Sequence, residues 1–359
     1  MTIRVETPEG ERALTEFLEF RDRVYAKRPV RWPTFAGLHL PMLQGEGPFA
    51  ERRRFRPFFA LDDGAPAARA VAMVDDRYIE HWNEQLGHVI LFEAMPDARE
   101  AAVAVLHAAS LWLREQGMEA VRAGYGNQEF PFVIDDYESL PAGFMRHNPP
   151  EYHAMFKDAG FETELGWVDY KIRVTPDLVA RYESAVENAR RAGYDLVWLA
   201  DIPKTQRITQ FVSLWNHAFA GHWGHSPFTE AEFGLYFDLL AGFGMLETSV
   251  IAYREGEPKG VLWITPDPSI GAIADGRPLR DDEKVNFLGI GVHESARRTG
   301  LNVAMASYSY LELIRGGATW LSYTLVRDDN RPSRSTAEKL GASVCANFVV
   351  YRRDFGPHR

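Results

Sequence analysis

The stretch VHESARRTGLNVAM, which runs from Val292 to Met305, decides how the second half of this sequence folds. The run VNFLGIGV before it (285–292) is short and apolar with two glycines, which predicts a buried strand. Apolar residues then recur at helical spacing and predict a helix with one buried face; they are Leu301, Ala304, Met305, Tyr308 and Leu311. Arg297–Gly300 is therefore expected to form the turn between a strand and a helix.

This turn has the features of an anion-binding site. The first backbone N–H groups of a helix have no partner inside the helix, and the positive end of the helix dipole lies behind them. Gly300 has no Cβ, so a ligand can approach the backbone there, and Arg297 and Arg298 add positive charge. A phosphate or pyrophosphate is the expected ligand. The spacing alone also fits a solvated turn, because Arg190–Gly193 repeats it at the end of a predicted helix.

The chain contains two similar series of predicted elements. One predicted hairpin turns at Asp62–Gly64 and another at Glu255–Gly256. A short helix predicted over 148–160 has a counterpart over 330–341, and each has an Asn N-cap, a proline in the first turn and a terminal glycine. Each half reads helix, hairpin, strand, helix, strand, helix, strand. This pattern predicts an α/β fold in which each half is a mixed, mostly antiparallel sheet flanked by helices.

Composition narrows the functional classes. The 359 residues allow two domains, and a net charge of −10 argues against binding to nucleic acid or to an anionic membrane surface. The sequence has one cysteine, Cys345, so no internal disulfide can form. Cys345 stands in an apolar run, which predicts that its side chain fills space in the core. The N-terminus has no signal-peptide pattern, and no apolar stretch has the length of a membrane span. We therefore expect a cytoplasmic protein without a membrane partner.

The quoted stretch resembles the acetyl-CoA motif of the GNAT superfamily of N-acyltransferases. In that motif a Val is followed at fixed spacing by Gln or Arg and then by Gly, which Val292, Arg297 and Gly300 match. The last motif position departs from the family, because it holds Asn302 where the family has Gly or Ala. The Asn302 side chain could crowd a pyrophosphate or could donate a hydrogen bond to it.

A second family signature is an Asn and a Ser or Ala before a helix that ends in Gly. Asn330, Ser333 and Gly341 match it. The order of elements fits the family in both halves, so the resemblance covers nearly the whole chain. The sequence is similar to tandem-GNAT proteins, with predicted domains at residues 1–174 and 175–359.

The first half departs from the family at its anion turn. The segment MPDAREAA (95–102) stands there, glycine is absent, and Asp97 and Glu100 satisfy the helix dipole themselves and would repel a phosphate. The first half is therefore expected to lack a cofactor site and to form a wall of the substrate cleft.

The resemblance implies that the second half binds an acyl-CoA co-substrate, acetyl-CoA in the first place. In the family the donor thioester lies between the fourth and fifth strands, and a backbone N–H of the fourth strand polarises its carbonyl. The residues implied to bind the cofactor are Ile290, Gly291, Val292, Arg297, Arg298, Thr299, Gly300, Leu301, Asn302, Val303, Asn330 and Ser333. No metal is expected.

The usual acid and base of the family are missing. The position of the family's Glu holds Asn286, and the position of its Tyr holds Ala337. Positioning two reactants can lower a barrier by about 7–11 kcal/mol, whereas acid–base help contributes about 3–5 kcal/mol, so an enzyme is not excluded. Tyr323 on the predicted fifth strand is a candidate replacement, although a purely structural tyrosine also fits.

Three histidines fall where the family places the helices that shape the acceptor pocket. His217, His222 and His225 occur in WNHAFAGHWGHSPF (215–228), and their spacing does not fit a zinc site on one helix. His222 is the candidate for a base or an acceptor-binding residue, although packing or surface roles fit all three. The further candidates for substrate contacts, each of which also fits a structural role, are Trp223, Glu129, His147 and Tyr152.

We expect an acyl-CoA-dependent N-acyltransferase in which an amine of a small molecule attacks the donor directly in a ternary complex. Two other classes stay open. A protein that holds an acyl-CoA without catalysis is favoured by the missing acid and base. An aminoacyl-tRNA-dependent transferase can also be built from two GNAT-like domains, but the intact Arg297–Gly300 turn and the net charge of −10 argue against it.

Overall fold

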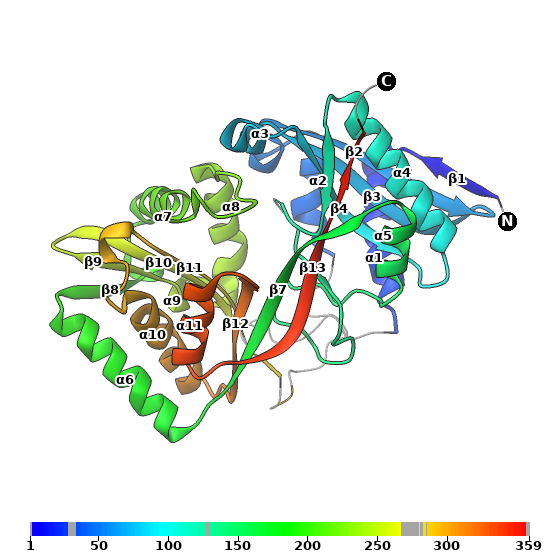
Figure 1. The fold of residues 1–359 in the computed structure, drawn as a ribbon. Helices are drawn as coiled ribbons and strands as arrows, with labels where there is room; N and C mark the ends of the chain where they lie inside the picture. The colour runs from blue at the N-terminus through cyan, green and yellow to red at the C-terminus, as the bar shows by residue number, and fades with distance from the viewer. Residues whose placement is uncertain are drawn as a thin grey trace. The chain divides into compact units, whose positions relative to one another are not determined.

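The computed structural model describes residues 2–27, 34–126, 129–266, 280, 283–284 and 286–356. Contacts within the chain divide it into two compact units, whose elements are drawn in Figure 1. Unit 1 consists of Met1–Glu138, Met145–Gly166 and Asn347–Arg359, and unit 2 consists of Ser139–Phe144 and Trp167–Ala346. Strands β7 (Glu162–Arg173) and β13 (Ser343–Asp354) therefore each begin in one unit and end in the other. The division after residue 174 concerns the repeated halves of the sequence and stays a prediction.

Unit 1 is a mixed, mostly antiparallel sheet with helices. Its further strands are β1 (Ile3–Glu6), β2 (Arg53–Asp62), β3 (Ala65–Asp75), β4 (Leu86–Ala94), β5 (Ala120–Ala123) and β6 (Phe132–Val133). Its helices are α1 (Glu11–Val24), α2 (Ala36–Leu43), α3 (Asp76–Trp82), α4 (Arg99–Glu115), α5 (Tyr152–Asp158) and the short 3-10 helix η1 (Pro48–Ala50). The strands are arranged in the order β1, β2, β3, β4, β5, β13, and β4 and β5 are the parallel neighbours in this row.

Both hairpins predicted from the sequence are present. Between β2 and β3 the residues Asp63 and Gly64 have φ values of 46° and 86°, and between β9 and β10 Glu255 and Gly256 have φ values of 55° and 78°. Two consecutive residues with positive φ make the tight turn whose twist matches that of the strands on either side. The Gly at the second position is the residue that adopts this conformation without strain.

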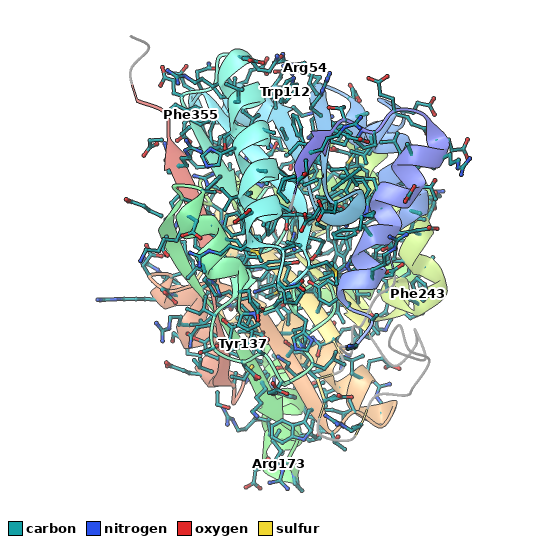
Figure 2. All side chains as sticks on the ribbon, turned by 90° about the vertical axis from the view of Figure 1, so that its right-hand side faces the viewer. Arg54, Trp112, Tyr137, Arg173, Phe243 and Phe355 are labelled. Carbon is teal, nitrogen blue, oxygen red and sulfur yellow. The ribbon has the colours of Figure 1, made fainter. Side chains whose placement is uncertain are left out.

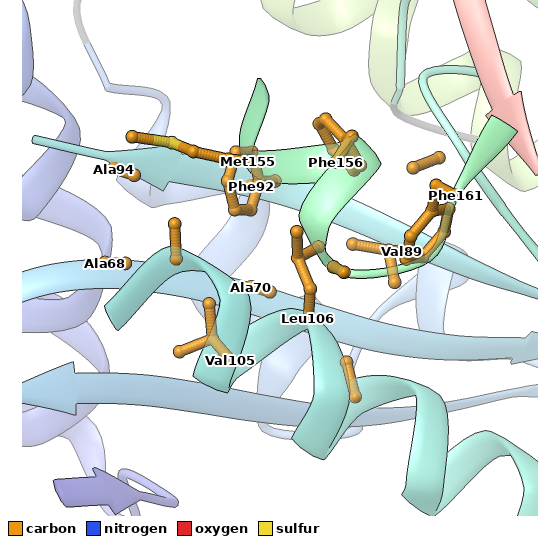
Figure 3. Packing of buried hydrophobic residues seen from close by; sticks show 14 of the residues in the cluster. Ala68, Ala70, Val89, Phe92, Ala94, Val105, Leu106, Met155, Phe156 and Phe161 are labelled. Carbon is orange, nitrogen blue, oxygen red and sulfur yellow. The ribbon is translucent and has the colours of Figure 1, made fainter. Parts of the chain in front are cut away.

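Consecutive phenylalanines on β2 show how helices cover both faces of the unit 1 sheet. Phe58 belongs to a buried cluster with residues of α4 and α5, and Figure 3 shows part of this cluster. Phe59 points to the opposite face, because successive side chains of a strand alternate. There it packs edge-to-face against Phe17 and Phe20 of α1, with ring centroids 5.5 Å apart in both pairs.

Helix α4 is the main cover of the first of these faces. Its buried residues recur every three or four positions, so one stripe of the helix faces the sheet; they are Ala101, Ala102, Val105, Leu106, Ala109, Ser110 and Leu113. Arg54 of β2 and Trp112 of α4 lie at the same end of unit 1 in Figure 2. At this end Arg54 Nη1 donates a hydrogen bond to Gln116 Oε1 at 2.6 Å, which ties β2 to the end of α4.

Unit 2 repeats the arrangement. Its further strands are β8 (Tyr194–Trp198), β9 (Val250–Arg254), β10 (Glu257–Pro266), β11 (Asn286–Val292) and β12 (Trp320–Arg327). Its helices are α6 (Pro176–Arg191), α7 (Lys204–Phe219), α8 (Glu230–Leu240), α9 (Met245–Thr248), α10 (Leu301–Arg315) and α11 (Arg331–Lys339), with the 3-10 helices η2 (Leu199–Asp201), η3 (Ala241–Phe243) and η5 (Glu294–Ala296). Strands β8, β9, β10 and β11 form one antiparallel sheet, whereas β12 belongs to the other sheet and pairs with β7.

Helices also cover both faces of the β8–β11 sheet. On one face Leu288 of β11 is buried together with Leu301, Met305 and other residues of α6, α10 and α11. On the other face Trp263 of β10 packs against Phe233 of α8, with ring centroids 5.6 Å apart. The fold predicted from the sequence, a mixed α/β architecture with helices on the sheets, is confirmed.

Helix α3 was not predicted from the sequence, although Asp75 is an N-cap signal. Its side chain accepts hydrogen bonds from the N–H groups of Arg77 and Tyr78.

Across the described part of the chain, none of the helices combines the length and the apolar character that crossing a membrane requires.

Candidate functional site

Side chains, instead of a ladder of backbone bonds, join β11 to β12. Asn286 Oδ1 accepts a hydrogen bond from Ser322 N at 2.9 Å, and Asn286 Nδ2 donates to Ser322 O at 3.0 Å. Two residues further along, Thr324 Oγ1 accepts from Leu288 N at 3.2 Å and donates to Leu288 O at 3.1 Å. The two strands thus belong to different sheets but are held together at two levels.

The geometry of β11 sets the direction of the Ile290 backbone groups, two residues beyond this link. Both backbone groups of Leu288 are directed toward β12, and peptide groups in a strand repeat their direction every second residue. The N–H and C=O of Ile290 are therefore directed to the same side. Strand β12 is irregular at this level, because its register with β7 shifts between Tyr323 and Val326 and Leu325 has a φ of 53°.

The predicted turn lies directly after β11. Beyond the short helix η5, Arg298 has a φ of 67° and Gly300 a φ of 85°, and Gly300 is the N-cap of α10. Arg297, Arg298, Thr299 and Gly300 are exposed, and no side chain caps the N-terminus of α10. The first N–H groups of this helix are thus available to an anion. A Cβ at Gly300 would have no atom within 4 Å, so the left-handed backbone, not crowding, is what favours glycine there.

Several residues implied to bind the cofactor meet between α10 and α11. Asn330 Oδ1 accepts a hydrogen bond from Ser333 N at 3.2 Å and so caps α11. Asn302 Nδ2 donates to Thr336 Oγ1 at 2.7 Å, which directs this side chain to α11. Tyr323 Oη lies 3.1 Å from Ser333 Oγ. The Asn302 side chain, which departs from the family motif, therefore has a hydrogen-bond partner inside the protein.

Tyr323 is buried, with 2% of its surface exposed. Burial raises the pKa of its hydroxyl to about 12, although the hydrogen bonds to Ser333 and Thr336 lower it. The hydroxyl therefore keeps its proton at neutral pH and is chemically able to donate it. The remaining cofactor candidates lie at the end of β11, which holds Gly291 and Val292, and in the first turn of α10, which holds Leu301 and Val303. The side chain of Leu301 is buried in the core.

The two glycines of β11 are explained by the packing of α7. A Cβ at Gly289 would lie 2.5 Å from Trp215 Cη2, and a Cβ at Gly291 would lie 2.9 Å from Ala218 Cβ and 3.2 Å from Phe219 Cε2. Any larger residue at either position would push α7 away from the strand. The glycines that suggested a buried strand thus also bring the end of α7 against β11.

The ring of His222 contacts one aromatic residue of α7 and one of β7. Its ring contacts Phe219, which packs on β11, at 5.5 Å between centroids, and Trp167 of β7 at 6.0 Å. Trp167 is paired with Arg327 at the end of β12. Trp223 also contacts Trp167, at 6.2 Å. His222 and Trp223, two of the predicted candidates, follow the end of α7, and both contact Trp167.

Burial lowers the pKa of His222, and the positive charge of Arg327 lowers it further. The imidazole is therefore neutral at neutral pH, the form in which it can accept a proton.

The three candidates of the first half are held by groups of unit 1. Glu129 Oε2 accepts a hydrogen bond from Leu91 N at 2.6 Å, its other oxygen pairs with Arg146, and burial raises its pKa. Tyr152 Oη accepts from Ala94 N and donates to Glu93 Oε2, both at 2.8 Å. These are interactions of a packed interior.

His147 completes this set, with Nε2 at 2.8 Å from the carbonyl oxygen of Tyr137. A substrate role for the three stays a prediction.

The two halves differ at the fourth strand. In the first half the Leu91 N–H on β4 donates to the Glu129 carboxylate, and α4, which follows this strand, has Glu100 in its first turn. An anion at that helix would meet a carboxylate.

Sequence reasoning missed Ser322, Thr324 and Trp167. A signal for the first two was present, since Ser and Thr alternate with large residues in an otherwise apolar strand. No comparable signal marked Trp167, because its role depends on the loop that folds over it.

The chain is similar to two curated bacterial proteins over most of its length, although no protein-family model matches it. Over 270 residues it is 25% identical to protein YghO of Escherichia coli, covering 73% of this chain and 67% of that protein. Over 281 residues it is 25% identical to a bacterial ceramide synthase of Caulobacter vibrioides, covering 76% of this chain and 71% of that protein.

The solved structures decide the architecture. A tandem GNAT protein from the clavulanic acid biosynthesis pathway matches over 100% of both chains with a TM-score of 0.60 and 13% sequence identity. The chain has a tandem GNAT fold. In this tandem GNAT fold β11 and β12 are the fourth and fifth strands of the second half, and the turn that resembles the acetyl-CoA motif joins β11 to α10.

Proposed function

We propose that this protein is an acyl-CoA-dependent N-acyltransferase whose donor site lies in the second half. One arrangement carries the proposal: β11 is linked to β12 up to Leu288, directs the Ile290 N–H to the same side, and then enters the uncapped N-terminus of α10 through Arg297–Gly300. The first feature suits a thioester carbonyl and the second suits a pyrophosphate. One ligand that contains both groups is an acyl-CoA.

The proposed reaction is direct attack of an amine on the thioester carbonyl carbon. The C–N bond forms, the carbonyl oxygen takes the negative charge and accepts a hydrogen bond from the Ile290 N–H, and the C–S bond then breaks. His222 takes the proton that the amine nitrogen loses and then releases it to water. Tyr323 gives a proton to the departing thiolate of CoA and regains one from water. Asn286 has no part in proton transfer, because an amide is not a base and both its ends are bonded to Ser322.

The proposed acceptor is an apolar amine. The rings of Phe219 and Trp167 contact His222, and Trp223 packs against Trp167, so aromatic surface that suits an apolar amine lies beside this base. A ceramide is an amide between a fatty acid and a long-chain amino alcohol, and the Caulobacter relative is named for making one. A long-chain acyl-CoA and a long-chain amine therefore stand beside acetyl-CoA and a small amine as the pair to test.

The experiment starts with the donor. Calorimetric titration of the full chain with CoA, acetyl-CoA and palmitoyl-CoA measures binding, and release of free thiol is then monitored with a long-chain amino alcohol or with glucosamine as acceptor. We expect micromolar donor binding and acceptor-dependent thiol release. Binding without release for any acceptor would favour a protein that holds acyl-CoA without catalysis. No binding of any of the three would contradict the proposal.

A further inference from the structure

Three side chains that could ligate a metal ion converge where α7 meets the end of β11. They are His217 in the last turn of α7, and His293 and Glu294 directly after the strand. One ligand atom of each lies within 4.8 Å of those of the other two. The side chains are accessible, with exposed fractions of 44% for His217, 30% for His293 and 59% for Glu294.

The orientation of each group favours ligation. His217 Nε2 is hydrogen-bonded to Glu294 Oε2, so these two atoms already face each other. The ring of His293 stacks on that of His217, with centroids 4.6 Å apart and an interplanar angle of 14°. His293 Nδ1 lies 2.8 Å from Ser295 Oγ and 3.2 Å from Ser295 N.

This contact with Ser295 gives His293 a choice of tautomer. With its proton on Nδ1, His293 donates to the Ser295 hydroxyl and keeps the lone pair of Nε2 for a metal ion. A hydrogen bond from the second ring nitrogen is the usual way in which proteins orient a histidine ligand. In the other tautomer Nδ1 accepts from the Ser295 N–H, and an ion would select the first form.

We propose that His217, His293 and Glu294 form a binding site for a divalent transition-metal ion, with zinc as the best fit. Two imidazoles and one carboxylate are a ligand set that binds zinc, with a water molecule in the fourth position. Tetrahedral coordination at about 2.0 Å brings neighbouring ligand atoms to about 3.3 Å from one another. Exposed side chains reach this spacing by small rotations, because nothing buried has to move.

The site would fasten α7 to the strand that leads into the Arg297–Gly300 turn. The residues after His217, Ala218 and Phe219, are those that pack on Gly291. A bound ion therefore adds a link at the end of a contact that already exists.

The test uses the full chain after treatment with a chelator and its removal. Calorimetric titration with zinc chloride is expected to give one ion per chain with a dissociation constant in the micromolar range. Cobalt(II) is expected to give the visible absorption bands of a tetrahedral site. His217→Ala, His293→Ala and Glu294→Gln should each weaken zinc binding by at least about tenfold. Glu294→Gln keeps a hydrogen-bonding partner for His217 but removes the charge.

His107→Ala is the matched control, because His107 is exposed on α4 and lies outside the cluster. Circular dichroism verifies that each variant is folded. Absence of zinc binding to the wild-type chain at 100-fold its expected dissociation constant would overturn the proposal. Undiminished binding in the double variant His217→Ala/His293→Ala would overturn it as well, because the ion would then be held elsewhere on this acidic protein.

Discussion

The hydroxyl of Thr324 on β12 holds both backbone groups of Leu288 on β11, accepting from the N–H at 3.2 Å and donating to the C=O at 3.1 Å. A backbone ladder would continue along the strands, but a side-chain link ends with the side chain. This relationship explains how β11 can stay attached to β12 at Leu288 without a backbone ladder that would continue to the Ile290 N–H.

Thr324→Val is expected to destabilise the protein, because the substitution keeps the shape but removes both hydrogen bonds. Two buried backbone groups lose their partner, and the expected loss is about 1–3 kcal/mol in the free energy of unfolding. Urea denaturation monitored by circular dichroism measures it. Thr205→Val, at an exposed position of α7, is the control and should change little. Equal stability of the two variants would show that the link to Leu288 contributes nothing.

Replacement of Gly300 tests the anion site without confusing charge with strain. Asn and Asp have the same shape and both tolerate the left-handed conformation that Gly300 adopts with a φ of 85°. Gly300→Asn should therefore retain most of the CoA affinity, whereas Gly300→Asp places a carboxylate at the helix N-terminus and should weaken binding at least about tenfold. Calorimetric titration with CoA compares them. Equal affinities in the two variants would argue against a phosphate at this turn.

His222→Gln is expected to lower kcat by about 10²-fold or more while leaving the donor dissociation constant nearly unchanged. Since burial and Arg327 lower the pKa of His222, the wild-type imidazole stays neutral below its ordinary pKa of 6.5. The rate should therefore hold from neutral pH down to a value below 6.5 and then fall as the imidazole gains a proton. A pH–rate profile of wild type and variant measures this. An acidic limb that persists unchanged in the variant would assign the base to another group.

Much of this architecture was predictable because its signals are local. Short stretches of sequence indicate the change from an apolar strand to a helical period around Arg297–Gly300. Short stretches also indicate the two hairpins, at Gly64 and Gly256. These signals also indicated the order of elements in both halves, and the tandem GNAT fold is confirmed by the solved structure that matches the whole chain.

The side-chain links were not predictable, because they join distant residues. Thr324 and Leu288 are 36 positions apart, and His217 and Glu294 are 77 positions apart. The spacing of His217, His222 and His225 argued against a metal site formed by these three residues on one helix. That spacing carried no information on His293 and Glu294, which follow β11 and lie beside His217 in the structure. The candidates Glu129 and Tyr152 were placed near a cleft from the sequence, whereas burial pairs them with Arg146 and Glu93 in unit 1.

Tyr323→Phe separates a proton donor from a structural tyrosine. With a pKa of about 12 the hydroxyl is protonated at neutral pH, so a role in catalysis is donation to the leaving thiolate. We expect kcat to fall by about 10²-fold with little change in donor affinity. Tyr170→Phe is the matched control: Tyr170 pairs with Tyr323 across β7 and β12, and its hydroxyl bonds to Arg334 at 3.2 Å. Equal rates in both variants would make Tyr323 structural.

His88 on β4 is expected to make unit 1 sensitive to acid. Within the described residues neither of its ring nitrogens has a hydrogen-bond partner, and 1% of its surface is exposed. Burial, with a smaller contribution from Arg122, lowers its pKa to about 3. An unfolded histidine takes up a proton near pH 6.5, so between pH 6.5 and about 3 the unfolded chain binds more protons than the folded one. Stability should therefore decrease as the pH falls through this window.

The variant His88→Leu removes this titration while keeping an apolar side chain against Tyr78 and Gly126, which contact the imidazole in the wild type. The decrease in melting temperature between pH 7 and pH 4.5, measured by calorimetry, should be smaller in His88→Leu than in wild type. His81→Leu on α3 serves as the control and should keep the wild-type decrease. A histidine that is neutral in the folded chain and takes up a proton in the unfolded chain must lower the stability as the pH falls. The same decrease in all three proteins would therefore mean that the acid sensitivity arises from groups other than His88.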